Sequence, residues 1–122
     1  MHSGFGALRE RCPMNIEASL PEVGARALRE WPEVTADVRR IDAMWCEQLA
    51  ASGGPFLFGA FGAADAFFAP VCFRFATYGL ETSAVARAYV ERILALPPVR
   101  EWSDAGRAEH DFLEIDEPYR QR

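Results

Sequence analysis

The chain offers few side chains that could catalyse a reaction. Its two histidines, His2 and His110, stand at opposite ends of the sequence, and neither falls in a metal-ligand spacing such as His-x-x-x-His. The cysteines, Cys12, Cys46 and Cys72, have no neighbouring histidine pattern that would activate a thiolate. The sequence therefore predicts no catalytic residue and no metal site.

Glycines and clustered acids are the other possible sources of chemistry. Gly53, Gly54 and Gly59 have the pattern of turn glycines, and their spacing does not match a dinucleotide-binding loop. Glu114 and Asp116 belong to an acidic cluster near the C-terminus, a pattern more typical of a solvated tail than of an acid–base pair. Taken alone, the residues predict no reaction.

Length and composition bound the class of protein. A chain of 122 residues with 50% hydrophobic and 25% charged residues predicts one globular domain over residues 1–122. A net charge of −5 argues against nucleic-acid binding. The longest apolar run, residues 66–73, is far shorter than the roughly 20 residues that a membrane span needs. The odd cysteine count and the lack of a signal-peptide pattern predict a cytoplasmic protein with free thiols, without nucleic-acid or membrane partners.

One stretch, residues 56–78, is the apolar centre of the sequence. From residue 63 onward its apolar side chains point all round a helix, which predicts a central helix buried on every side. Each buried Phe contributes roughly 1.5–3 kcal/mol, so this helix supplies the largest hydrophobic contribution. The apolar side chains are Phe67, Phe68, Val71, Cys72, Phe73 and Phe75.

Gly62 and Asp65 have the spacing of a helix cap. In a capping box an acid three residues after the cap bonds back to the cap's amide, and Gly62 lacks only the usual hydroxyl. We therefore expect Gly62 and Asp65 to be structural capping residues.

The other elements are predicted to surround this helix. Residues 1–11 have helical spacing, residues 13–32 are expected to form a loop excursion, and residues 33–52 carry an apolar stripe that includes Trp45. A further helix with Val85 facing inward precedes Pro97, a short one with Trp102 as its anchor follows, and residues 110–122 form a charged tail. No alternation typical of strands occurs. The prediction is an all-α bundle of about five helices.

Three segments resemble one known family. Residues 54–59, Gly-Pro-Phe-Leu-Phe-Gly, are followed by Gly62-Ala-Ala-Asp65, which is similar to the sixth-helix region in the C-terminal domain of glutathione transferases. The family has Ser or Thr where this chain has Gly62, so the cap in this chain lacks the hydroxyl. Residues 2–5, His-Ser-Gly-Phe, look like a segment on the first helix of that domain in bacterial members, and residues 94–102 look like the turn into its penultimate helix.

The resemblance implies a function that the residues alone do not. In this family an N-terminal thioredoxin-like domain binds glutathione, the cosubstrate, and activates its thiol. The helical domain forms the opposite wall of the cleft for a small electrophilic substrate and contributes to a homodimer. The pattern of the thioredoxin-like domain is not found in these 122 residues, and a helix that starts at residue 1 without a cap suggests an upstream segment.

Position in the family assigns His2, Ser3 and Phe5 to substrate binding. The alternative is that His2 belongs to a frayed terminus and that Phe5 is a core residue. Two alternative functions follow. In the first, the chain is the substrate-binding and dimerisation half of a glutathione transferase and is inactive when isolated. In the second, it is a stand-alone helical module for protein–protein interaction. The reading frame upstream of Met1 would discriminate between them.

Overall fold

The computed structural model describes residues 4–109, 111, 113–115 and 118–119. Within these residues every regular element is a helix, and the only β contacts are isolated bridges between Phe56 and Gly59 and between Phe58 and Ala60. The all-α prediction is therefore confirmed. The helices are α1 (Gly6–Arg11), α2 (Pro21–Glu30), α3 (Pro32–Ser52), α4 (Ala63–Thr77), α5 (Ala84–Leu94) and α6 (Pro97–Ala108).

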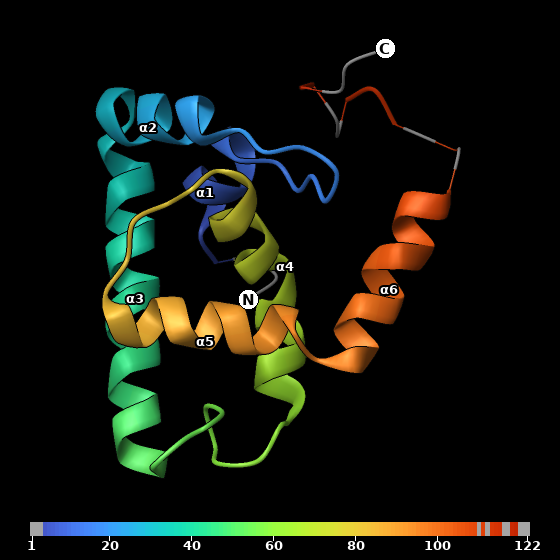
Figure 1. The fold of residues 1–122 in the computed structure, drawn as a ribbon. Coiled ribbons are helices and arrows are strands. Elements are labelled where there is room, and N and C mark those ends of the chain that lie inside the picture. The colour runs from blue at the N-terminus through green and yellow to red at the C-terminus, as the bar shows by residue number, and fades with distance from the viewer. Residues whose placement is uncertain (1–3, 110, 112, 116–117, 120–122) are drawn as a thin grey trace.

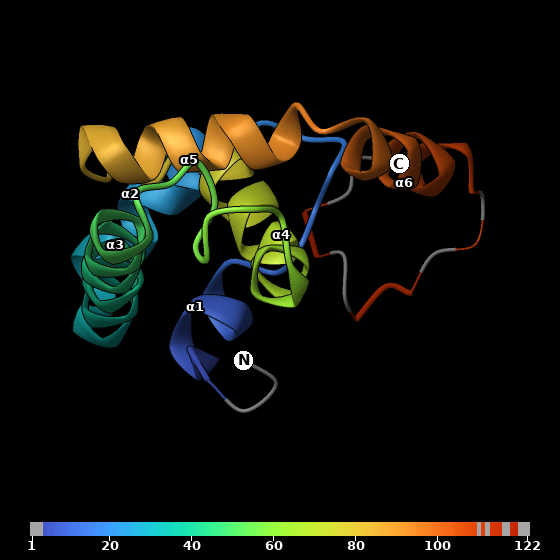
Figure 2. The same cartoon turned by 90° about the horizontal axis from the view of Figure 1, so that it is seen from below.

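The helices are arranged around α3 and α4. Figure 1 shows α3 upright beside α4, with α5 crossing both and α2 lying over one end. In the view from below, α5 covers one face of the α3–α4 pair and α1 lies on the opposite face, while α6 stands to one side (Figure 2). No helix in the described part of the chain is long and apolar enough to cross a bilayer.

The core is centred on Trp45 of α3. Its ring lies 5.4 Å from Phe68, 5.3 Å from Phe75 and 4.9 Å from Tyr89, measured between ring centroids. The indole N–H finds no acceptor among the described residues, so Trp45 contributes packing and not a polar anchor. The predicted stripe of α3 is confirmed, because each of its members is buried: Val34, Val38, Ile41, Trp45 and Leu49.

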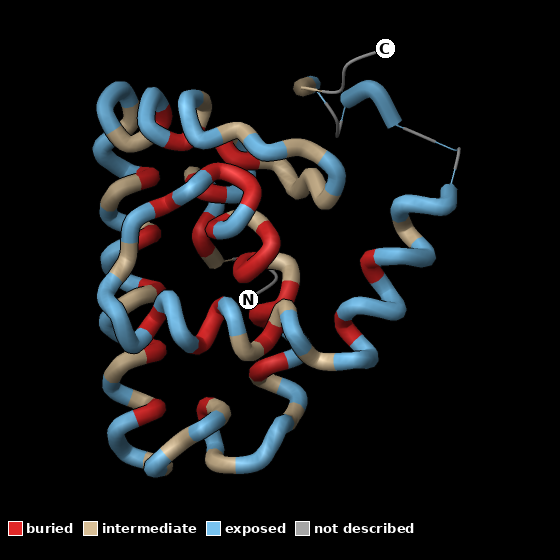
Figure 3. The backbone as a smooth tube through the Cα atoms, in the orientation of Figure 1, coloured by how far each residue is buried: buried red, intermediate tan, exposed pale blue. Residues whose placement is uncertain are grey.

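The central helix α4 is less enclosed than the sequence predicts. Phe68, Phe73 and Phe75 are buried, but the side chain of Phe67 is 65% exposed (Figure 3 colours the chain by the burial of each residue). The prediction of burial on every side is therefore wrong at this position. The reason is that α1, α3, α5 and α6 leave one side of the N-terminal half of α4 uncovered.

The segment 13–32 also differs from the expected loop excursion, because it contains α2. Pro21 is the first residue of this helix, a position where its missing N–H leaves no bond unmade. Gly24 lies inside it, and a Cβ atom there would stand 2.0 Å from the carbonyl oxygen of Tyr78. Pro21 therefore starts the helix, and Gly24 allows its close contact with the end of α4.

Two predicted inward residues lie outward. Tyr89 and Ile93 of α5 face the core as expected, but Val85 is 51% exposed, because Ala86 and not Val85 faces the core at the start of this helix. Trp102 is 52% exposed, because α6 turns Val99 and Ser103 inward instead. In both helices a small residue faces the core and allows close packing.

Candidate functional site

The first candidate region is the N-terminal segment that leads into α1. His2 and Ser3 lie outside the described residues, so their assignment to substrate binding remains a prediction. Phe5 precedes α1 with a left-handed backbone (φ 57°), which is uncommon for a residue with a side chain. Its ring is buried in the core, and the guanidinium of Arg40 lies 5.4 Å from the ring centroid. Phe5 therefore anchors the described residues that lead into α1.

The short helix α1 is held on the bundle from both ends. The backbone N–H of Leu8 donates to the Asp37 carboxylate of α3 at 3.1 Å, and the Leu8 side chain is fully buried. At the other end, the Arg11 guanidinium lies 4.3 Å from the centre of the Trp31 ring, a cation–π contact. These contacts give residues before α1 a fixed platform.

The connection after α1 has no regular structure, yet helical side chains fix its backbone. Arg74 donates to the carbonyl of Cys12 at 3.0 Å, Tyr78 to that of Pro13 at 2.5 Å, and Thr77 to that of Asn15 at 2.5 Å. Each donor comes from the last part of α4 or from its C-cap. The loop therefore satisfies its polar groups through side chains instead of through a helix or sheet.

Asp65 is a buried polar centre at the start of α4. Its Oδ2 accepts from the Gly62 N–H at 2.9 Å, and its Oδ1 accepts from the Leu57 N–H at 3.2 Å and the Tyr89 hydroxyl at 2.7 Å. Gly62 has an extended backbone and no side chain, so the acid supplies the side-chain half of the cap. These bonds include the expected one from Asp65 to the Gly62 amide, and the Asp65 side chain is fully buried.

Neither Tyr89 nor Cys72, which neighbour this carboxylate, is suited to proton transfer near neutral pH. Burial and then the hydrogen bond to Asp65 raise the pKa of Tyr89 above its ordinary range. Burial and then the Asp65 charge raise the pKa of the Cys72 thiol likewise. Burial also raises the pKa of Cys12 to about 11, with Arg74 acting weakly in the other direction. Both thiols are therefore protonated and unreactive.

A second polar cluster joins α3 to the start of α5. The Ser83 hydroxyl donates to Asp42 Oδ1 at 2.6 Å and its N–H to Asp42 Oδ2 at 2.8 Å, while Ser83 also caps α5 by accepting from the Ala86 N–H. The Cys46 thiol lies 3.3 Å from Asp42 Oδ1. Burial opposes ionisation of Asp42, but these hydrogen bonds hold its pKa below the ordinary value. Among the described residues no group of three or more His, Cys, Asp or Glu is arranged to hold a metal.

An apolar hollow of about 350 Å³ lies between α4 and the start of α6. Phe61 and Trp102, both about half exposed, form part of its wall, and Pro70 and Val99 form another part. Its volume falls in the range of small-molecule pockets. The sequence does not predict this hollow, because helical periodicity indicates which side of each helix is apolar but not where two helices leave a gap between them.

The comparison with known families agrees with this architecture. The family model described as "Glutathione S-transferase, C-terminal domain" matches residues 6–105, a stretch that begins with α1 and extends into α6. No curated protein and no solved structure matches the chain. Because the family model covers most of the sequence and the described fold is entirely helical, this chain belongs to the glutathione S-transferase C-terminal domain family.

Proposed function

We propose that this chain is the substrate-binding and dimerisation half of a glutathione S-transferase. In that reaction the thiolate of glutathione attacks the electrophilic carbon of a small substrate, a C–S bond forms, and the leaving group departs with its electron pair. A thioredoxin-like domain, on the same polypeptide or on another, would bind glutathione and take up the thiol proton. The helical domain would bind the electrophile. The single observation that carries this proposal is the family match over residues 6–105.

The anchoring of α1 supports the proposed role of His2 and Ser3. A side chain that orients a substrate must be held on rigid elements. Phe5 is buried, the Leu8 amide is bonded to Asp37, and the following loop is bonded to Arg74, so the described residues that follow Ser3 are fixed on the bundle. We assign substrate contact to His2 and Ser3, and assign to Phe5 the anchoring of this segment beside the substrate.

The apolar hollow at Phe61 and Trp102 supports the proposal that this chain binds an apolar substrate or an apolar surface of a partner. A homodimer in the cytoplasm is the proposed working form, and a reducing compartment would keep the cysteines free, as they are in the structure.

Conjugation assays test the proposal. The 122-residue chain should not conjugate glutathione to a generic chloronitrobenzene acceptor, and it should not be retained on immobilised glutathione. The same chain preceded in one polypeptide by its thioredoxin-like domain should show conjugation. Activity of the helical domain alone would contradict the assignment of thiol activation to another domain.

The alternative function is a stand-alone helical module for protein–protein interaction. The exposed aromatic rings of Phe58, Phe61 and Phe67 favour it, because exposed apolar patches mark interaction surfaces. The reading frame upstream of Met1 separates the two functions. An in-frame thioredoxin-like segment supports the transferase, and a stop codon with a ribosome-binding site directly before Met1 supports the module.

A further inference from the structure

A second hollow, of about 390 Å³, lies between the C-terminal half of α4, the end of α5, the middle and last part of α6, and the connection that follows α1. Its apolar lining includes the ring of Phe73 and the side chains of Ala76 and Leu94. Its polar lining comes largely from α6, which contributes Arg100 and Arg107. The hollow thus combines an apolar surface with two cationic side chains and one carboxylate, that of Asp104.

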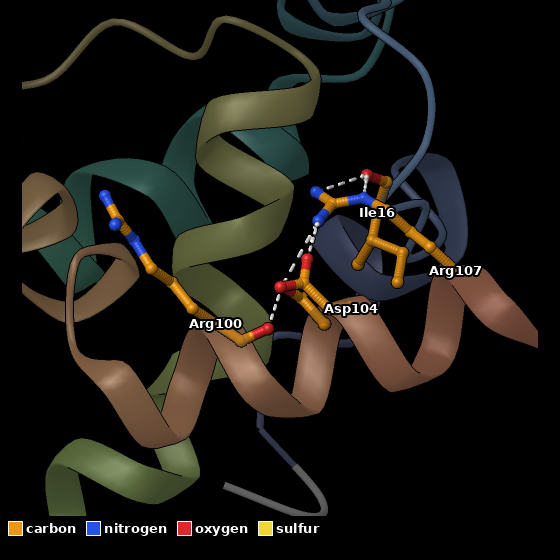
Figure 4. A network of polar contacts seen from close by, with 5 residues as sticks. Ile16, Arg100, Asp104 and Arg107 are labelled. Carbon is orange, nitrogen blue, oxygen red and sulfur yellow. Dashed lines mark hydrogen bonds and ion pairs between the residues drawn. The ribbon is translucent and has the colours of Figure 1, made fainter.

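One wall of this hollow is fixed by Arg107. Its guanidinium donates to the carbonyl oxygen of Ile16 through Nε at 3.3 Å and Nη2 at 3.1 Å, and to the Ser103 hydroxyl and the Asp104 carboxylate through Nη1 (Figure 4). Gly106 allows the close approach, because a Cβ there would stand 2.9 Å from Ile16 Cδ1. The Arg107 charge is compensated by Asp104 at 3.0 Å.

Arg100 differs from Arg107 in having no such partner. Its carbonyl accepts from Ser103, but its guanidinium makes no hydrogen bond or ion pair with any described residue. Figure 4 shows the side chain extending away from the Arg107–Asp104 pair. A planar guanidinium presents donors that match a carboxylate in a two-bond geometry. The hollow therefore has an uncompensated positive charge next to an apolar surface.

We propose that this hollow binds a small organic carboxylate whose apolar body rests on Phe73 and Leu94 and whose carboxylate pairs with Arg100. The volume admits a small-molecule ligand. The apolar lining selects against inorganic anions, because they have no surface to bury, and the Arg100 charge selects against neutral molecules of the same shape. Binding at this hollow does not depend on glutathione chemistry.

The test is an NMR titration of the ¹⁵N-labelled full chain with 2-naphthoate. Saturable shift changes are expected at the amides of Ala76, Thr77 and Ser103, which line the hollow. The neutral analogue 2-naphthalenemethanol and inorganic phosphate should each bind more weakly. In Arg100→Gln, Kd for 2-naphthoate should rise by about tenfold, or about 1.4 kcal/mol, through loss of the charged pair.

Arg87→Gln is the matched control. Arg87 is an exposed arginine on α5 that lines a different hollow, so its removal should leave Kd unchanged. Circular dichroism should show both variants folded, because both side chains are exposed. Equal Kd values in the wild type and Arg100→Gln would overturn the proposal. So would a Kd weaker than about 1 mM, or shift changes centred on Phe61 and Trp102.

Discussion

The hydroxyl of Tyr89 donates to the carboxylate of Asp65 across 2.7 Å, and both side chains are completely buried. This bond joins the start of α4 to the middle of α5. The same carboxylate accepts from the amides of Leu57 and Gly62, so one acid organises the loop before α4, the cap of α4 and its contact with α5. Burying a charge is costly unless hydrogen bonds satisfy it, and these bonds supply that compensation.

Asp65→Ala should lower the free energy of unfolding by about 2–4 kcal/mol, because the buried donors that it served lose their acceptor. Tyr89→Phe removes one of these donors and should cost about 1–2 kcal/mol. Glu91→Ala, an exposed change on α5, should stay within about 0.5 kcal/mol. Urea unfolding measures all three. Equal stability of Asp65→Ala and the wild type would show that the carboxylate contributes nothing.

Gly24→Ala should destabilise the fold by at least about 3 kcal/mol, because the new Cβ would overlap the Tyr78 carbonyl and push α2 away from α4. Gly6→Ala is the matched control, since a Cβ at Gly6 meets nothing within 4 Å. That variant should be unchanged or more stable by up to about 1 kcal/mol. Thermal unfolding of the two proteins compares them directly, and similar midpoints would contradict the close contact.

The sequence predicts those features of this fold that depend on local pattern. The stripe through Val34 and Trp45 is local, and α3 follows it. The sequence does not predict α2, because proline and glycine disfavour helices on average. Here Pro21 is favoured as the first residue of the helix, and Gly24 is favoured because its backbone packs closely against Tyr78. Such a contact joins residues far apart in sequence, so no local pattern records it.

The candidate sites show the same division. The spacing of Gly62 and Asp65 is local and predicts a cap, but the bond to Tyr89 spans 24 residues and depends on where α5 crosses α4. Both hollows depend equally on how far α6 stands from α4. Their lining residues could not be assigned before the helices were placed.

Asp42 should make stability depend on pH. Its folded pKa is lowered below the unfolded value, so its stabilisation is present above the unfolded pKa and is lost as pH falls through the folded pKa. The stability difference between wild type and Asp42→Asn should therefore be largest near neutral pH and shrink below about pH 4. Urea unfolding at several pH values measures it. A pH-independent difference for Asp42→Asn would contradict the role of Ser83.

His2→Ala should lower kcat/KM for glutathione conjugation in the polypeptide that includes the thioredoxin-like domain, by about 10-fold or more if His2 orients the electrophile near the sulfur. Urea unfolding should show no loss of stability. Arg87→Gln is the control for an exposed position far along the chain, and its kcat/KM should be unchanged. Unaltered kcat/KM in His2→Ala would indicate that His2 is a terminal residue that makes no contact with the substrate.

Cys46 should react with a disulfide reagent such as 5,5′-dithiobis(2-nitrobenzoate) faster than the other cysteines. Cys12 and Cys72 are completely buried, and a pKa of about 11 leaves only about one Cys12 in a thousand ionised at pH 8. Cys46 is half-buried, and its thiol lies near the surface contact between Asp42 and Ser83. One thiol should therefore react rapidly in the folded protein, and the remaining two should react after unfolding in guanidinium. Cys46→Ser should abolish the rapid phase, whereas a second rapid thiol would mean that the core around Cys12 or Cys72 opens readily.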